Sequence, residues 1–490
     1  MTQNRNINQR TQTQRDQTQR ASHASSGTMH HAQGEAANRQ EGQVSSGGIL
    51  NLEAAKMLIT RRNLLLGAAG VVAVAGIAAG ANHVADSISE ESEIPVLNLP
   101  ADSVEGTSAY DQDEMDNCVV LQSRAELPYG TLVWSSCPTV AACLLPTDTA
   151  SPLTQVALWS ITSGMDVTVL EESIGIDEGY EIYDVRATDE AIVWTEANIL
   201  QGSWRIYSAA VSDLSLGEPV LMESGNCSEW ETPSIAAVGP YIYWQRLPNI
   251  DGEFAAEQST LRKAKAGATT FTTVARSTGR MATAPYALID GIVITPRAEA
   301  EGVYYQPTLL DAKTNEVLDT FVMPQNMKPQ DVGYGKNGFI IAMGAIYDFN
   351  DGLSNLGCFS PVTKPQSAAE YSTVKWVTYT RQPSAPPCWS NSWFIVKSTQ
   401  AVCGFDPESK RSFVVDTQNG SEDWGDYLAT TGICDTFVTF AHVDYTPLNS
   451  GVVRAVVTED EEGNSKVTYE DTSETEDPLY CTLVRAWTTL

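Results

Sequence analysis

Residues 241–244 read Tyr-Ile-Tyr-Trp, and apolar runs of this kind recur along most of the chain. Each run has three or four residues and follows a turn rich in Gly, Pro, Asn or Asp. A continuous apolar run of this length is typical of a β-strand that is buried on both faces. The runs begin at Leu132, Ile192, Tyr241, Ile292, Phe339, Trp393 and Phe437, at intervals of 60, 49, 51, 47, 54 and 44 residues.

Further strands accompany each run. Alternating strands are expected to follow it, as at 204–208 and 261–264, and an inner strand is expected to precede it, as at 183–186. Helical periodicity is absent outside 64–81. Four short antiparallel strands at a period near fifty are typical of β-propeller blades. The sequence therefore predicts an all-β fold, a propeller of seven blades, with six or eight blades as alternatives.

The periodicity resembles that of exported bacterial propellers, a loose group that includes TolB-like domains. The resemblance covers residues 110–490 and lacks the Gly-His and Trp-Asp dipeptides of WD-repeat blades. It implies a fold and leaves the function open, because propellers serve as hydrolases, lyases, redox enzymes and binding scaffolds alike.

Composition divides the chain. No Phe, Trp, Tyr or Cys occurs before Tyr110, so the packed core is expected in a domain spanning 110–490. Residues 86–109 are predicted to be an acidic linker. Residues 1–59 form a Gln- and Arg-rich leader with few large apolar groups, which predicts disorder.

Residues 60–85 carry an export address. Arg61 and Arg62 precede Leu64 and Leu65, as in the twin-arginine signals of bacteria, and Ala79-Gly80-Ala81 fits a small-residue cleavage site. The uncharged run 64–81 is also close to the length that spans a bilayer as a transmembrane helix. Both readings predict export across the bacterial cytoplasmic membrane, either as a secreted protein or as one anchored through 64–85 and facing outside.

The chain has 61 Asp and Glu against 30 Lys and Arg, a formal net charge of −31. A surface of that sign repels phosphate backbones, so the folded domain is not expected to bind nucleic acid. Besides the export machinery, the expected partner is a protein or polymer ligand whose identity the sequence does not give.

Familiar catalytic motifs are missing or out of context. His442 is the one histidine after residue 85, which argues against a multi-histidine metal centre and favours a structural role. Gly333 to Gly338 match a dinucleotide-binding string, yet the residues that follow are strand-like. We therefore expect these glycines to form a tight turn within a blade.

Carboxylates remain as candidates. Asp184, Glu231 and Asp331 flank predicted inner strands and are the best candidates for a carboxylate site, although turn or surface roles are the alternative for each. Asp348, Asn350 and Asp351 precede Gly352 and resemble part of a calcium loop, with a polar turn as the alternative. No other metal or cofactor is predicted.

Cysteines suggest disulfides. Cys118 and Cys481 each open a strand near one end of the predicted ring, and disulfides persist outside the cytoplasm. A Cys118–Cys481 bridge would close the ring, with two independent core thiols as the alternative. Cys137 and Cys143 are candidates for a second, local bridge.

Two functions follow from these observations. The first is a binding or scaffold propeller of the cell envelope. The alternative is an exported enzyme of glycoside hydrolase or lyase type, acting through carboxylates on an envelope or extracellular polymer. A channel holding two or three converging carboxylates would favour the enzyme.

Overall fold

The computed structural model describes residues 94–298, 301–344, 356–397, 399–417, 421, 424–444, 453–459, 465–471 and 480–490. Three predicted features lie outside the described residues: the leader 1–59, the proposed export signal at 60–85 with Arg61, Arg62, Leu64, Leu65, Ala79 and Ala81, and the loop with Asp348, Asn350 and Asp351. Among the residues that are described, no helix has the length and apolar character needed to cross a membrane.

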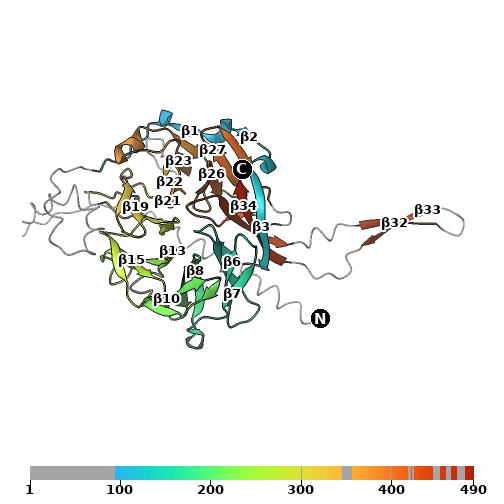
Figure 1. Ribbon diagram of the computed structural model, residues 1–490, viewed down its shortest axis with the longest axis horizontal. Coiled ribbons are helices and arrows are strands. Elements are labelled where there is room, and N and C mark those ends of the chain that lie inside the picture. Colours follow the sequence, from blue (N-terminus) through green and yellow to red (C-terminus); the bar gives the residue numbers. More distant parts are fainter. Residues whose placement is uncertain are drawn as a thin grey trace, which may run out of the picture. The chain divides into compact units, whose positions relative to one another are not determined.

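The described chain is all-β. Its helical elements are five short 3-10 turns, η1 (Ala101–Ser103), η2 (Thr107–Ala109), η3 (Met115–Asn117), η4 (Ile176–Glu178) and η5 (Ala368–Ser372). Its strands form antiparallel sheets that follow one another along the sequence and lie side by side around a common centre (Figure 1). The predicted β-propeller fold is confirmed.

The first four sheets each use consecutive strands. Sheet 1 contains β4 (Leu132–Trp134), β5 (Val140–Pro146), β6 (Thr154–Ser160) and β7 (Asp166–Leu170). Sheet 2 contains β8 (Glu181–Ala187), β9 (Ala191–Asn198), β10 (Ser203–Ser212), β11 (Ser215–Leu216) and β12 (Val220–Asn226). Sheet 3 contains β13 (Ser234–Val238), β14 (Tyr241–Arg246), β15 (Ser259–Lys265) and β16 (Thr272–Ser277). Sheet 4 contains β17 (Tyr286–Ala287), β18 (Gly291–Ile294), β19 (Thr308–Asp311) and β20 (Val317–Thr320).

The next two sheets gain an outer strand from the start of the domain. Sheet 5 contains β21 (Asp331–Gly335), β22 (Gly338–Met343), β23 (Gly357–Pro361), β24 (Trp376–Tyr379) and, parallel to β24, β1 (Val104–Gly106). Sheet 6 contains β25 (Cys388–Ser390), β26 (Trp393–Lys397), β27 (Val402–Asp406), β28 (Arg411–Val414), β30 (Ile433–Cys434) beside β25, and β2 (Asp111–Gln112) parallel to β28.

Residues 94–109 were predicted to belong to an acidic linker. In the structure Leu97 and Leu99 are only 3% and 1% exposed, and they lie in the core that sheets 4 to 6 share. The segment then continues into β1. The start of the described chain is thus packed along the outer edges of these sheets.

Sheet 7 joins distant parts of the sequence. It contains β29 (Tyr427–Leu428), β31 (Thr436–Asp444), β34 (Tyr480–Thr489) and, as its outer strand, β3 (Val119–Pro128). A separate hairpin of β32 (Val453–Glu459) and β33 (Ser465–Asp471) lies in the connection between β31 and β34. A strand from near the start of the domain, β3, thus shares one sheet with the last strand, β34.

The core lies between neighbouring sheets. One cluster of buried side chains belongs to sheets 7 and 1, another to sheets 1 and 2, and others to sheets 2 and 3, 3 and 4, 4 to 6, and 6 and 7. A strand in such a stack has core on both faces, which explains the continuous apolar runs. Trp194 on β9 and Trp244 on β14, for example, are fully buried.

Six of the seven apolar runs are the second strands of their sheets, and one is not. The run at Leu132 is β4, the first strand of sheet 1, whereas the second strand begins at Val140. The second strand was missed because its buried positions include Ala141, Ala142 and Cys143, which make a weaker apolar signal than the aromatic runs.

The glycine string at 333–338 forms the turn between β21 and β22, as expected. Gly338 has φ +103°, a conformation that favours glycine. A Cβ at Gly335 would overlap the indole ring of Trp389 on the next sheet. These glycines therefore serve packing and turn geometry.

The disulfide predictions are wrong. Because β3 and β34 are antiparallel, Cys481 lies opposite Pro128, while Val119, next to Cys118, lies opposite Thr489. The two thiols are therefore separated by nearly the whole strand length, roughly 30 Å at the usual rise, and no bridge forms. Cys143 packs in the core between sheets 7 and 1 and Cys137 packs against the core between sheets 1 and 2, so this pair is unbridged as well.

The two ends of the sheets differ in their connections. The turns between first and second strands are short, as at 239–240, 336–337 and 391–392. The connections between second and third strands are longer, as at 247–258 and 445–479. Since neighbouring strands are antiparallel, these two kinds of connection lie at opposite ends of the sheets.

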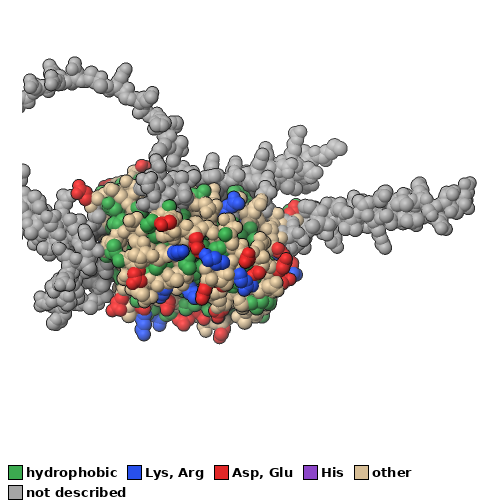
Figure 2. Space-filling model, turned by 90° about the horizontal axis from the view of Figure 1, so that it is seen from above, with side chains coloured by type: hydrophobic (Ala, Val, Ile, Leu, Met, Phe, Trp, Pro, Cys, Tyr) green, Lys and Arg blue, Asp and Glu red, His purple; other side chains and the backbone are tan. Residues whose placement is uncertain are grey.

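Figure 2 shows the surface from the side of the ring of sheets. Acidic and basic side chains are interspersed on this face, and neither sign gathers into one large patch. This distribution is unlike the basic stripe of a nucleic-acid-binding domain.

Candidate functional site

The centre of the ring contains a cavity of about 350 Å³. Its walls come mainly from the first strand of each of the seven sheets or from residues close to that strand, and Phe440 on β31 adds to them. Most of the lining is apolar, and the charged side chains are Asp184, Arg186 and Asp331. We call this cavity the central channel.

The alternation of β8 places two charged residues in the channel. Asp184 and Arg186 line it, whereas Val185 and Ala187 are buried in the core between sheets 1 and 2. A strand directs successive side chains to opposite faces, so this i, i+2 pair shares one face. The sequence Tyr-Asp-Val-Arg thus supplies a charged pair to the channel without placing charge in the core.

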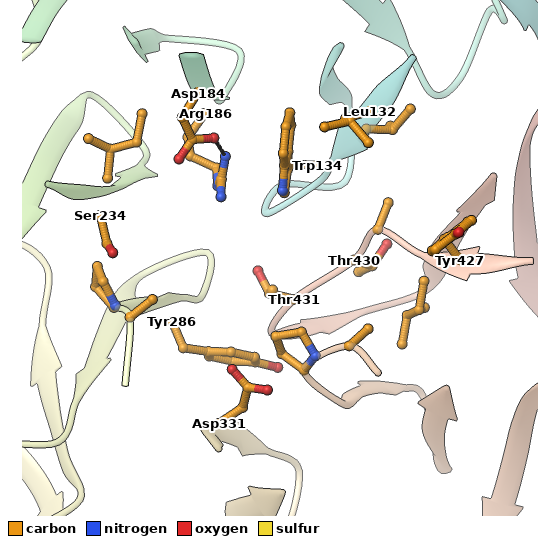
Figure 3. A pocket seen from close by; sticks show the side chains of 18 of the residues that line it. Leu132, Trp134, Asp184, Arg186, Ser234, Tyr286, Asp331, Tyr427, Thr430 and Thr431 are labelled. Carbon is orange, nitrogen blue, oxygen red and sulfur yellow. Dashed lines mark hydrogen bonds and ion pairs between the residues drawn. The ribbon is translucent and has the colours of Figure 1, made fainter. Parts of the chain in front are cut away.

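Arg186 is held by three groups on one side of the channel (Figure 3). Its Nη1 forms an ion pair with Asp184 Oδ1 and donates to the carbonyl of Val185 at 2.7 Å. Its guanidinium also lies over the indole of Trp134, 4.3 Å from the ring centroid. A charge that is paired and stacked in this way is satisfied inside the protein.

Asp331 occupies a different environment. It lies at the start of β21, next to Tyr286 in Figure 3, and no hydrogen bond or ion pair reaches its carboxylate from the described residues. Burial alone raises the pKa of this carboxyl to about 6. The ordinary value near 4 would leave it ionised well below neutral pH, so its surroundings oppose the charge.

Tyr286 fixes the wall beside Asp331. Its hydroxyl donates to the carbonyl of Pro387 at 2.9 Å and accepts from the backbone N–H of Gly432 at 2.6 Å. These bonds join sheet 4 to the residues directly before β25 and β30, two neighbouring strands of sheet 6. With its hydroxyl engaged, Tyr286 leaves an aromatic ring as the wall of the channel.

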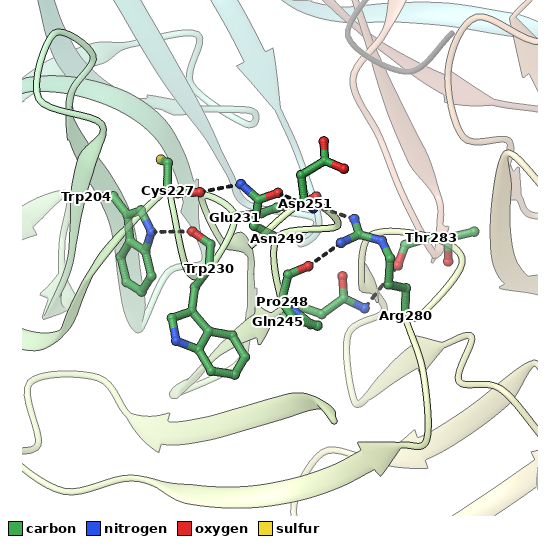
Figure 4. A network of polar contacts seen from close by, with 10 residues as sticks. All are labelled: Trp204, Cys227, Trp230, Glu231, Gln245, Pro248, Asn249, Asp251, Arg280 and Thr283. Atoms are coloured by element: carbon green, nitrogen blue, oxygen red, sulfur yellow. Dashed lines mark hydrogen bonds and ion pairs between the residues drawn. The ribbon is translucent and has the colours of Figure 1, made fainter. Parts of the chain in front are cut away.

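The three carboxylate candidates separate in the structure. Asp184 and Asp331 both line the channel, on different sides of it (Figure 3). Glu231 lies in the connection between sheets 2 and 3, where its carboxylate pairs with Arg280 at 2.5 Å (Figure 4). Arg280 also donates to the carbonyl of Pro248 at 2.5 Å, which gives this ion pair a role in tying loops together.

Sequence reasoning missed Arg186, Trp134 and Tyr286. The i, i+2 spacing of Asp184 and Arg186 on a predicted inner strand was a usable signal for the first. Trp134 was assigned to a doubly buried strand, and nothing local marks Tyr286, because its partners are about 100 and 146 residues away.

His442 is not part of the channel lining. It lies on β31, where Nδ1 is 3.0 Å from Thr482 Oγ1 and the ring packs near Tyr129 and Phe440. This environment agrees with the structural role expected for it. Within the described residues, no group of three or more His, Cys, Asp or Glu is arranged to hold a metal ion.

Comparisons with known proteins concern the fold alone. No family model and no curated protein matches the chain. A prolyl endopeptidase is similar with a TM-score of 0.44 and 9% identity, over 72% of this chain and 54% of that one. This chain therefore spans about half the length of that enzyme.

Two further structures cover their own chains almost completely. The β-propeller domain of the Trilobed protease from Pyrococcus furiosus matches with a TM-score of 0.31 and 10% identity, over 60% of this chain and 99% of that one. BamB from Moraxella catarrhalis matches with a TM-score of 0.32 and 12% identity, over 76% and 99%. At such values the similarities concern the fold alone and say nothing of this chain's activity, ligand or location.

Proposed function

We propose that this protein is an extracytoplasmic binding module of the cell envelope whose ligand enters the central channel. The observation that carries this proposal is Asp331, a carboxylate without a hydrogen-bond or ion-pair partner among the described residues, in a cavity to which all seven sheets contribute. A charge that is partly buried without a partner costs stability, and groups with perturbed pKa values cluster at functional sites. Ligand binding is one reason to keep it.

The export address supports the location. Arg61-Arg62, the uncharged segment 64–81 and the small residues Ala79 and Ala81 together resemble a twin-arginine signal. In this proposal the chain crosses the cytoplasmic membrane and stays either free or anchored through 64–85.

The proposal treats the seven sheets as seven blades of one closed ring. Contacts between strands of successive sheets support it, from sheet 1 to sheet 7 and back from β3 to β5. Backbone hydrogen bonds between Ser135 and Ala429, at 3.0 Å, and between Thr431 and Ser135, at 2.9 Å, join sheets 7 and 1 beside the channel. A ring without an open edge also avoids unpaired strands.

The alternative of a carboxylate enzyme has less support. A glycosidase-type reaction needs two carboxylates to converge on one bond. Asp184 is engaged with Arg186, and Figure 3 draws it across the channel from Asp331. This arrangement favours holding a ligand over acting on it.

The test is site-specific photo-crosslinking in the bacterial envelope. A benzophenone amino acid at Ser234, in the channel, should capture a ligand in the exported fraction. The same group at Glu316, on an exposed turn of sheet 4, is the matched control. Mass spectrometry of the adduct identifies the ligand, and mass spectrometry of the envelope polymers shows whether they have been cleaved. Together the two measurements distinguish the binding module from the enzyme.

An adduct at Ser234 alone, with envelope polymers unshortened, is the expected result. Equal labelling at both positions, or protein that stays in the cytoplasm, would contradict the proposal. Ligand fragments that accumulate with wild-type protein and not with Asp331→Asn would favour the enzyme.

A further inference from the structure

We infer that the central channel recognises a protonated amine, held by the carboxylate of Asp331 against the aromatic wall of Tyr286. This inference rests on the proposed function and names the chemistry of its ligand. The amine is either a small molecule or the side chain of a lysine from a partner polypeptide, and the experiment below separates these sources.

The charged side chains that line the channel do not balance. Asp184 and Arg186 neutralise one another, so Asp331 leaves the channel with one uncompensated negative charge. Arg186 is already bonded to Asp184 and to the carbonyl of Val185, and its ring partner is Trp134. The cation that complements Asp331 therefore has to come from outside the described residues.

The carboxylate of Asp331 matches an ammonium group in hydrogen bonding. A carboxylate accepts from up to four directions, and an ammonium group offers three donors. No described donor reaches Asp331, whereas the hydroxyl of the neighbouring Tyr286 is fully engaged with Pro387 and Gly432. The carboxylate of Asp331 can therefore accept hydrogen bonds from a ligand. The hydroxyl of Tyr286 does not compete for the donors of that ligand, because it is already engaged.

The wall of the channel is aromatic and apolar around the carboxylate. Tyr286 contributes an aromatic ring to the channel, and aromatic rings attract cations through their faces. The remainder of the lining is largely apolar, with Val332, Ile235 and Leu428 among it. This setting suits an alkylammonium, which has an apolar stem and a charged end.

Position 331 holds a charged aspartate where a neutral asparagine would fit. Asparagine has nearly the same shape as aspartate and would avoid the burial cost of an unpaired anion. The raised pKa of Asp331 expresses that cost. A cationic ligand would remove it by supplying the missing partner, which gives the carboxylate a use that asparagine cannot replace.

The volume limits the ligand. A cavity of about 350 Å³ lies at the small end of ligand sites. It accommodates an alkylamine or one long side chain. Whole folded domains would have to remain at the mouth.

Calorimetry with defined probes tests this inference. n-Pentylamine is compared with n-pentanol and with pentanoate, which keep the stem and change the end group. A capped Gly-Lys-Gly peptide is compared with the same peptide carrying norleucine, which lacks the amine. Each probe is titrated to its solubility limit against wild type, Asp331→Asn and, as the charge-matched control, Asp290→Asn on an exposed turn.

Wild type and Asp290→Asn should bind an amine, with Asp331→Asn weaker by roughly 10- to 100-fold, as expected for loss of a charge-assisted bond. Binding of the lysine peptide without binding of pentylamine identifies a polypeptide source, and the converse identifies a small molecule. Circular dichroism verifies that each variant is folded.

No amine binding to wild type, or equal binding to Asp331→Asn, would overturn the inference. The Ser234 crosslink distinguishes that failure from failure of the proposed function. An adduct that persists in Asp331→Asn leaves a channel ligand of another chemistry, whereas loss of the adduct from wild type removes the channel as a binding site altogether.

Discussion

The backbone N–H of Leu490 donates a hydrogen bond of 2.8 Å to the carbonyl of Cys118, two residues that are 372 positions apart. This bond lies at one end of the β3–β34 pair, whose other end joins Pro128 to Cys481. The pairing between the two strands closes sheet 7.

Val484 on β34 tests how much this closure contributes to stability. It is fully buried between sheets 7 and 1 and pairs with Ala125 on one side and Phe440 on the other. Val484→Ala is expected to lower the free energy of unfolding by about 1–3 kcal/mol, because it removes two buried methyl groups. Urea denaturation followed by circular dichroism measures it.

Val120→Ala is the matched control, since Val120 lies on the partner strand β3 and is 49% exposed. Its effect should stay within about 0.5 kcal/mol. Equal losses from the two substitutions would show that the strand pair is not part of the core.

Asp331 should make stability depend on pH. Its folded pKa, about 6, lies above the unfolded value near 4, so its contribution is fully present below pH 4 and is lost as pH rises to 6 and beyond. At pH 7.5 the free energy of unfolding of Asp331→Asn is therefore expected to exceed that of wild type. The difference should be about 1–2 kcal/mol, since water in the channel screens part of the charge. At pH 4 the two proteins should be nearly equal, and a less stable variant at pH 7.5 would contradict the burial argument.

Amine binding should depend on the same carboxyl. As pH falls below 6, Asp331 takes up a proton and loses its attraction for ammonium, so affinity should fall about tenfold per pH unit. Burial raises the pKa values of neighbouring Tyr286 and Cys358, which keeps both groups neutral across this range. The Asp184–Arg186 pair also faces the channel, and calorimetry of Asp331→Asn from pH 5 to pH 8 should show no such slope if Asp331 is responsible.

Lys397 on β26 predicts a second pH dependence, of opposite kind. Its side chain is buried, with Nζ donating to the carbonyls of Thr399 at 3.0 Å and Trp424 at 2.7 Å, and burial lowers its pKa to about 8. The unfolded chain holds this proton up to about pH 10.4, so between pH 8 and that value the unfolded state binds more protons and stability rises with pH.

Lys397→Met should remove this rise, worth at most about 3 kcal/mol. The measurement is the difference in unfolding free energy between wild type and Lys397→Met from pH 7 to pH 10. A constant difference across that range would mean that Lys397 keeps an ordinary pKa.

Export should depend on the arginine pair. The double substitution Arg61→Lys and Arg62→Lys keeps the charge and is expected to leave the folded domain in the cytoplasm, as judged by cell fractionation. Arg15→Lys with Arg20→Lys, in the leader, should export normally. Undiminished export of the first variant would refute the twin-arginine interpretation.

The sequence was informative about the fold because burial on both faces produces long apolar runs such as Phe339 to Ile341. It was less informative where the buried residues are small, as at Ala141 and Ala142, which is why the second strand of sheet 1 was misplaced. The cysteine pairing failed for a topological reason, since two residues that both open a strand end up at opposite ends of an antiparallel pair.

The candidate site was half visible in the sequence. Asp184 and Asp331 were selected because they flank inner strands, and both line the channel. Glu231 met the same criterion and forms a loop ion pair instead, because the position of a carboxylate along a strand does not reveal its neighbours. Asp331 has no partner among the residues that the structure describes, and this depends on how all the sheets are arranged, so no local sequence signal marks it.

The composition of sheet 7 has a consequence for the order of events in the cell. β3 is synthesised early, but the strand beside it, β34, is synthesised more than 350 residues later. The ribosome therefore releases six sheets before the seventh acquires its outer edge, and contacts of such long sequence separation form slowly. In the proposed export of an already folded domain, the pairing of β3 with β34 would be the last folding step between translation and export.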